Sequence, residues 1–197
     1  FIVFLGMSIA VSYYYLDLKD FDSLLDERSR GSVTLQNNAG EFFAWRGDNF
    51  SENLTSNNIS PHLKNAVLAT EDRRFYEHFG ISPRGIASAV YINLKEGRGP
   101  LSGHGGSTIT QQTAKLVCLG KTFRQSEWES EKAYEASCRK STVWRKLKEA
   151  LYALSLEFKF SKDEILTIYI NRVFLGAGAR GFDCLLYTSP SPRDRSI

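Results

Sequence analysis

The sequence predicts a mainly helical domain, and three observations support this fold class. Ser60-Pro61 and Ser82-Pro83 each indicate a helix start, because proline is favoured at the first helical position. Apolar residues recur at helical spacing through residues 143–158. A capping-box pattern then opens at Ser161, with a glutamate three residues later. We therefore expect the chain from 60 to 171 to be mostly helical.

The N-terminal residues 1–16 carry no charge and end in the tyrosine run 13–15. A spanning helix needs about 20 apolar residues, and tyrosines suit the water–lipid interface. We expect a truncated transmembrane anchor at 1–16, with a buried core helix or a signal-peptide core as alternatives. Residues 17–59 are expected to form a linker and a small β-hairpin, whose turn lies at 37–40.

Inward-facing stripes can be assigned to three of the expected helices from the spacing of apolar residues. The helix after Pro83 is expected to bury Ile86, Ala89, Val90 and Leu94. The helix after the glycine-rich loop is expected to bury Ile109, Thr113, Leu116 and Val117. The longest helix is expected to bury Val143, Leu147, Ala150, Leu151, Leu154 and Phe158.

The composition is that of an ordinary globular protein. The chain has 197 residues, 42% hydrophobic and 24% charged, which is enough for one domain with a core. The net charge of +3 is too small to indicate a nucleic-acid partner. The three cysteines form no CxxC pair, so no metal site is expected.

Two short stretches concentrate residues that can carry chemistry. "ATEDRRFYEHFG", residues 69–80, places three acids, two arginines, three aromatic residues and a histidine at one helix end. "GGSTITQQTAK", residues 105–115, places glycines before a helix N-terminus, whose free amides suit an anion. By themselves these residues are equally compatible with purely structural roles. His78 would be an ordinary loop histidine, and Arg145 with Glu149 a surface pair one helical turn apart.

Four motifs in order carry a family resemblance: "EDRRFYEHFG", "GGSTITQQTAK", "RKLKE" and "KDEILTIYIN". They resemble the successive motifs of the peptidoglycan glycosyltransferase family, which includes the transglycosylase domain of class A penicillin-binding proteins and the monofunctional transglycosylases. The resemblance covers residues 60–183. It implies a lysozyme-like helical domain on the periplasmic side of the bacterial cytoplasmic membrane, held by a single-pass anchor. It also implies lipid II as the substrate, a growing glycan strand as the product and undecaprenyl pyrophosphate as the leaving group.

The resemblance also assigns roles to residues. Glu71 matches the general base that takes a proton from the acceptor 4-hydroxyl, and Glu149 matches a second essential carboxylate. The positions matched to substrate binding are Asp72, Phe75, His78, Ser107, Thr108, Gln111, Gln112, Lys115, Arg145, Lys146 and Asn171. Pyrophosphate is a good leaving group, so one base and a set of cations suffice for an inverting hexosyltransferase. No cofactor is required, although a divalent cation at the pyrophosphate fits the chemistry.

This chain departs from the family pattern at three places. Thr167 stands where the fourth motif usually carries a glutamate. The segment between Lys115 and Arg145 is longer than usual, and Cys118 and Cys138 flank its extra residues. Outside the cytoplasmic membrane the compartment permits a disulfide between them, with two unrelated thiols as the alternative.

The third departure is at the C-terminal end. After residue 183 the resemblance stops, and residues 184–197 read "CLLYTSPSPRDRSI". This segment looks like the translation of a sequencing-library adapter, so we expect a non-native tail on an incomplete domain. A Pro/Ser-rich disordered tail is the alternative.

Two other functions remain open at this point. The first is a lysozyme-like lytic enzyme that cleaves peptidoglycan. The second is a non-catalytic cell-wall scaffold. The glycosyltransferase hypothesis predicts the cytoplasmic membrane and a cell-wall synthesis complex as partners, and no nucleic acid.

Overall fold

The computed structural model confirms a mainly helical fold. It describes residues 2–26, 33–39, 42–46, 54–56, 58–100, 102–103, 105–121, 123–140, 142–176 and 179–180. The helices are α1 (Ile2–Asp17), α2 (Phe21–Asp26), α3 (Pro61–Glu71), α4 (Pro83–Lys95), α5 (Ile109–Leu116), α6 (Glu131–Arg139), α7 (Val143–Lys159) and α8 (Lys162–Arg172), with short 3-10 turns at Phe75–Glu77 and Cys118–Gly120. The tail predicted at 184–197 lies outside the described residues.

In the described part of the chain, four short strands form two separate antiparallel ribbons. Strands β1 (Val33–Gln36) and β2 (Phe42–Arg46) pair on either side of the predicted turn, which confirms the hairpin. The amide of Ala39 donates to the side chain of Asn37 in this turn. Strands β3 (Phe174–Gly176) and β4 (Ala179–Arg180) form the second ribbon directly after α8.

The helix starts form where the sequence places them. Pro61 opens α3 and Pro83 opens α4, where the Ser82 hydroxyl accepts a hydrogen bond from the amide of Gly85 at 3.1 Å. Helix α8 begins with the predicted capping box at Ser161. Helix α5 begins with a second capping box, built by Thr108 and Gln111. Both boxes satisfy amides that a helix N-terminus otherwise leaves open.

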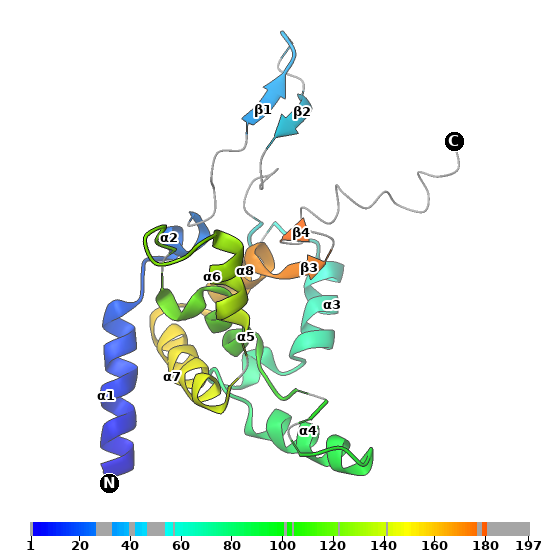
Figure 1. The fold of residues 1–197 in the computed structure, drawn as a ribbon. Coiled ribbons are helices and arrows are strands. Elements are labelled where there is room, and N and C mark those ends of the chain that lie inside the picture. The colour runs from blue at the N-terminus through cyan, green and yellow to red at the C-terminus, as the bar shows by residue number, and fades with distance from the viewer. Residues whose placement is uncertain are drawn as a thin grey trace.

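Helices α5 and α8 lie at the centre of the helical body, with α7 packed across α5 (Figure 1). Helix α8 is buried from Ile165 to Ile170, where its residues are apolar except Thr167. The residues of the main core with no exposed surface are Leu24, Ile109, Ala114, Tyr152, Leu156, Ile165, Leu166, Ile168 and Ile170.

The predicted inner face of α4 is only partly correct: Ala89 is buried, but the ends of the predicted stripe are exposed. Ile86 is 41% exposed and Leu94 is 57% exposed, whereas Asn93 is fully buried. The reason is that α4 covers the loop that follows it rather than an apolar neighbour. The Asn93 side chain donates to the carbonyl of Pro100 at 3.2 Å, and its carbonyl accepts from the amide of Arg98 at 2.8 Å.

The predicted inner face of α7 is also wrong at its ends, because Val143 is 83% exposed and Phe158 is 63% exposed. Helix α7 packs against α5 on one side and α1 on another. The predicted stripe lies toward the α1 side, where Leu154 and Phe158 line a groove. The face toward the core instead carries Glu149, Tyr152, Ala153, Ser155 and Leu156.

The transmembrane prediction for 1–16 is not supported by the structure. These residues form α1, a helix of 16 residues. Within the part of the chain that the structure describes, no helix has both the length and the apolar character needed to cross a membrane. Helix α1 packs beside α7, where the Ser155 hydroxyl donates to the carbonyl of Val11 at 2.9 Å and the rings of Tyr14 and Tyr152 meet edge to face.

The extra residues between α5 and α7 fold into a small unit around α6. Cys118 and Cys138 form a disulfide, with their Cα atoms 5.2 Å apart. These two residues and Tyr134 make a second apolar cluster, against which Phe123 and Trp128 pack. The disulfide that the sequence analysis expects is therefore present, and it joins α6 to the turn after α5.

We expect loss of this disulfide to destabilise the protein. The bridge spans a sequence separation of 20, and closing such a loop contributes about 3 kcal/mol. Cys118→Ser/Cys138→Ser should lower the free energy of unfolding by about that amount in urea without reductant. Cys184→Ser is the matched control and should match the wild type. Equal stability of the double variant and the wild type would contradict the prediction.

Asp163 joins three segments at the start of α8. Its carboxylate accepts from the Ser56 hydroxyl at 2.6 Å, from Lys64 at 3.0 Å and from the Tyr76 hydroxyl at 2.8 Å. The bond from Ser56, followed by those from Lys64 and Tyr76, lowers the pKa of Asp163. The ionised carboxylate is therefore the form that the folded state prefers.

This lowered pKa sets the sign of an acid dependence. A carboxyl whose pKa is lower in the folded state stabilises the fold above its unfolded value, and that stabilisation is lost as the pH falls through the folded value. Between about pH 5 and pH 2, the wild type should lose more unfolding free energy than Asp163→Asn. The side chain is 55% exposed, so the difference should be small. Parallel denaturant titrations at both pH values would measure it, and identical acid dependence would refute it.

Candidate active site

Asp72 connects the end of α3 to the start of α5. Its carboxylate accepts from the backbone amide of Ile109 at 3.1 Å and contacts Nε2 of His78 at 2.9 Å. The side chains of Asp72 and His78 are only 7% and 9% exposed. A carboxylate at a helix N-terminus also interacts favourably with the helix dipole. Asp72 and His78 therefore fix the backbone next to Glu71. An acid and a histidine occur together in this stretch because they form the junction between α3 and α5.

Glu71 is the last residue of α3, and its side chain is exposed. The amide of Gln112 donates to its carboxylate at 2.9 Å, and the Gln112 carbonyl accepts from the Tyr169 hydroxyl at 3.5 Å. Tyr169 is 2% exposed. Burial, together with the nearby charge of Glu71, raises the pKa of Tyr169, so its hydroxyl remains a donor. Hydrogen bonds thus connect the buried Tyr169, through Gln112, to the accessible carboxylate of Glu71.

A first cavity of about 480 Å³ lies beside Glu71. Its walls come from the end of α3, the start of α4 and the glycine-rich loop. The lining residues are Glu71, Asp72, Arg73, Arg74, Glu77, Ser82, Gly85, Gly105, Gly106, Ser107 and Thr108. A Cβ at Gly106 would lie 2.7 Å from the Cα of Ile86, so this glycine is required where the loop crosses α4.

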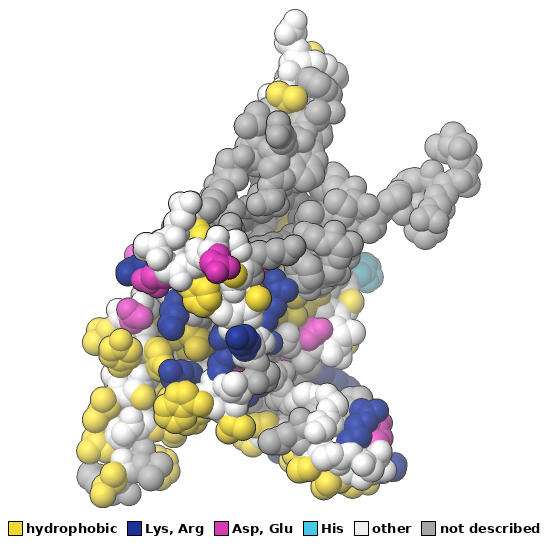
Figure 2. Space-filling view, in the orientation of Figure 1, with side chains coloured by type: hydrophobic (Ala, Val, Ile, Leu, Met, Phe, Trp, Pro, Cys, Tyr) yellow, Lys and Arg dark blue, Asp and Glu magenta, His cyan; other side chains and the backbone are white. Residues whose placement is uncertain are grey.

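A second cavity of about 420 Å³ lies along α5. Its lining residues are Ser107, Gln111, Gln112, Lys115, Leu116, Glu135, Cys138, Arg139, Lys146, Arg172 and Val173. Ser107 belongs to both linings, so the two cavities adjoin there. The second lining holds four basic residues and one acid, which makes it suited to an anion. Lys and Arg side chains gather on the face around α5 and α6 (Figure 2).

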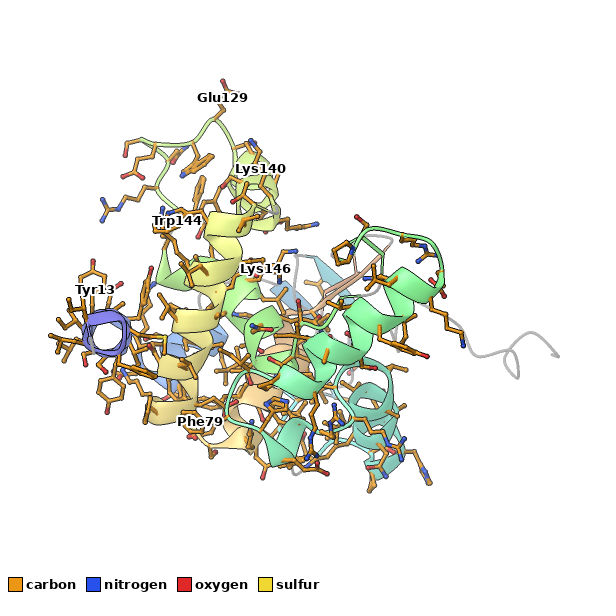
Figure 3. All side chains as sticks on the ribbon, turned by 90° about the horizontal axis from the view of Figure 1, so that it is seen from below. Tyr13, Phe79, Glu129, Lys140, Trp144 and Lys146 are labelled. Atoms are coloured by element: carbon orange, nitrogen blue, oxygen red, sulfur yellow. A yellow bond between two sulfur atoms is a disulfide. The ribbon has the colours of Figure 1, made fainter. Side chains whose placement is uncertain are left out.

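Glu149 lies inside α7 and pairs with two cations. Its carboxylate is 3.3 Å from Nε of Arg145 and 2.8 Å from Nζ of Lys146, and its side chain is 3% exposed. Lys146 also donates to the Ser107 hydroxyl at 2.8 Å and lies on the side of α7 that faces α5 (Figure 3). Glu149 lines neither cavity, and its contacts are with these two cations.

Other predicted residues have structural contacts. Phe75 is 1% exposed in the core, with the Lys162 ammonium 4.5 Å above its ring. The Asn171 side chain bonds both backbone groups of Leu54 and the carbonyl of Thr167. Thr167, which replaces the family glutamate, accepts from the amide of Ser56. Phe75 and Asn171 therefore line neither cavity.

The structure adds residues that the sequence analysis missed. Tyr169 supports Gln112, and Arg139, Arg172 and Glu135 line the second cavity. Tyr169 lies within the fourth motif, so its place in "IYIN" was an available signal. Arg139 and Glu135 lie in the extra segment, whose path the helical spacing does not predict.

Comparison with known proteins agrees with this geometry. Residues 39–184 match the family described as Transglycosylase. The chain is 43% identical over 114 residues to penicillin-binding protein 1B of Vibrio cholerae, covering 58% of this chain and 12% of that protein. It is 35% identical over 193 residues to penicillin-binding protein 1A of Neisseria lactamica, covering 97% and 22%. It is 34% identical over 176 residues to penicillin-binding protein 1A of Escherichia coli, covering 88% of this chain and 18% of that protein.

The chain thus spans only 12% to 22% of the length of these relatives. The family match, by contrast, extends through all four motifs and both cavities. This chain belongs to the transglycosylase family.

Proposed function

We propose that this chain is a peptidoglycan glycosyltransferase that polymerises lipid II and releases undecaprenyl pyrophosphate. One observation carries the proposal: the exposed carboxylate of Glu71 lies in a cavity that adjoins a second, strongly basic cavity at Ser107. A transfer reaction needs an acceptor and a donor side by side. The first cavity would hold the acceptor, and the second would hold the donor pyrophosphate.

The reaction would be a direct displacement at the anomeric carbon of the donor sugar. The acceptor 4-oxygen forms the new bond while its proton passes to Glu71, which acts as the general base. The bond to the phosphate oxygen breaks, and the pyrophosphate leaves with the electron pair. Attack from the opposite side converts the α-linked donor into a β-linked product, as an inverting hexosyltransferase requires.

The basic residues would stabilise the charge that develops on the leaving group. Lys115 and Lys146 line the second cavity, and Glu149 holds Lys146 and Arg145 in place. Preorganised cations need no rearrangement during the reaction. We propose no resident cofactor. A divalent cation bound by the pyrophosphate oxygens themselves fits the chemistry.

The position of Glu149 argues against a lytic enzyme. Glycosidases commonly place two carboxylates on either side of the scissile bond, one to protonate the leaving sugar oxygen. Here Glu149 is 2% exposed and ion-paired with Arg145 and Lys146. The acids that do line the cavity with Glu71 are Asp72, which binds α5, and Glu77. Pyrophosphate departure needs no such acid.

We also propose that the domain works on the periplasmic side of the cytoplasmic membrane, with a lysozyme-like arrangement of its helices. Helix α1 exposes Ile2, Phe4, Ile9 and Leu16, which suit contact with lipid. Lipid II and the growing strand both carry lipid tails, so a membrane surface would keep them near the cavities. A cell-wall synthesis complex is the expected protein partner.

We expect Glu71→Gln to reduce strand polymerisation at least about 100-fold, which is the range for loss of a general base. Lipid II binding and the free energy of unfolding should remain near the wild-type values, because Glu71 is exposed. Gel analysis of glycan strands and urea denaturation would measure the two effects. Near-normal polymerisation would exclude Glu71 as the base, and binding without turnover by the wild type would favour the scaffold.

Glu149→Gln should lower activity and stability together. Breaking a buried ion pair costs about 3–5 kcal/mol, and the half-exposed Lys146 places the expected loss near or below the lower end of that range. The same denaturation assay checks it. Wild-type stability with lost activity would instead indicate that Glu149 acts directly on substrate.

Lys115→Ala should weaken donor binding by roughly tenfold or more, because one charge-assisted contact to pyrophosphate is removed. The matched control is Lys95→Ala, at the exposed end of α4 and outside both linings. Titration with lipid II at low and high salt would separate this effect from a change in folding. Equal affinities for the two variants would remove Lys115 from the donor site.

A further inference from the structure

The extra segment between α5 and α7 forms one wall of the basic cavity. Glu135, Cys138 and Arg139, all on α6, line the same cavity as Lys115 and Lys146. The second and third family motifs supply Lys115 and Lys146, and Arg172 directly follows the fourth motif. Only Arg139 comes from the extra segment. Its charge would therefore be added to a site that the motifs already build.

Three contacts hold helix α6 in place. The Cys118–Cys138 disulfide fixes its C-terminal half to the turn after α5. The Tyr134 hydroxyl donates to the carbonyl of Lys121 at 2.5 Å. A guanidinium nitrogen of Arg145, in the third motif, donates to the carbonyl of Ser137 at 2.9 Å. Arg139 follows directly after Cys138, so these contacts fix the backbone from which its side chain extends.

Glu135 fixes the side chain of Arg139 in turn. Nη2 of Arg139 lies 3.1 Å from the Glu135 carboxylate, and the two side chains are 51% and 6% exposed. A buried carboxylate needs a cation beside it, so Arg139 is held at the cavity while much of its surface remains open. A guanidinium carries five N–H donors in a fork that matches phosphate oxygens. Arg139 can thus bind a carboxylate and a phosphate together.

A second pair in the same segment provides a comparison. Arg124 and Glu127 are also close, at 3.3 Å, but their side chains are 68% and 56% exposed. Neither residue lines the cavity. This is the geometry of an ordinary surface pair, which contributes little. The burial of Glu135 and the position of Arg139 distinguish the pair on α6 from this pattern.

We propose that α6 is a disulfide-anchored wall of the donor site, and that Arg139 is an additional ligand for the phosphates of a polyprenyl pyrophosphate. This inference rests on the proposed function, because it assigns the basic cavity to the donor. It goes further in giving a binding role to a segment outside the four motifs. The disulfide would matter for affinity as well as for stability.

The first test measures binding of inorganic pyrophosphate and of undecaprenyl pyrophosphate by calorimetry. Arg139→Gln should weaken binding of both by roughly tenfold, because a charge-assisted contact is lost. Arg139→Lys should recover part of the loss, since it keeps the charge without the fork. Arg124→Gln is the matched control and should bind as the wild type does. Equal affinities for Arg139→Gln and Arg124→Gln would overturn the proposal.

The second test is a double-mutant cycle with the disulfide. In a Cys118→Ser/Cys138→Ser background, at a temperature where circular dichroism shows both proteins folded, Arg139→Gln should change pyrophosphate affinity by less than about threefold. The reason is that an unanchored α6 no longer holds Arg139 at the cavity. A full tenfold loss in that background would overturn the role of the disulfide as an anchor.

Failure of this inference can be distinguished from failure of the proposed function. Lipid II polymerisation by the wild type, with no dependence of pyrophosphate binding on Arg139, would overturn the inference alone. Pyrophosphate binding that depends on Arg139, without polymerisation, would overturn the proposed function alone. A wild type that binds neither pyrophosphate would overturn both assignments of the basic cavity.

Discussion

The carboxylate of Asp72 holds the C-terminal end of α3 against the N-terminal end of α5, and the candidate site depends on this junction. One bond reaches the amide of Ile109 and another reaches His78. Through the junction, the carboxylate of Glu71 at the end of α3 comes within 2.9 Å of the side-chain amide of Gln112 on α5. Both cavities open along the same short stretch of backbone, because they share Ser107. The carboxylate of Glu71 can therefore remain exposed while its backbone stays fixed by buried contacts.

Two buried acids of the site are each paired with a more exposed base. Glu149 is buried and balances Arg145 and Lys146, which avoids the penalty of an isolated charge in the interior. Lys146 extends from this pair to Ser107, where the cavities meet. The buried acid thus positions the ammonium of Lys146 at the wall of the basic cavity. The same pattern recurs at α6, where the buried Glu135 holds Arg139. In both pairs a buried glutamate holds a basic side chain at the wall of the basic cavity.

The extra segment shows how a chain can extend a family site. Its own apolar cluster is small, with Cys118, Tyr134 and Cys138 as the buried members. A core of that size cannot hold a helix by hydrophobic burial alone. The disulfide and the bond from Arg145 to Ser137 supply the missing constraint. The segment is thereby tied to the third motif as well as to α5.

Interactions between residues close in sequence determined the helix starts and the hairpin of this protein. Proline at the first helical position, the capping box at Ser161 and the hairpin turn act within a few residues, so the sequence predicts them. Order and spacing of the four motifs likewise indicated the family. Only the tertiary structure decided which helix faces are inside, as Asn93 and Phe158 show. It also decided that Phe75 and Asn171 support the fold and that Arg139 reaches the cavity. These outcomes depend on neighbours distant in sequence, and spacing along one helix carries no information about what packs against it.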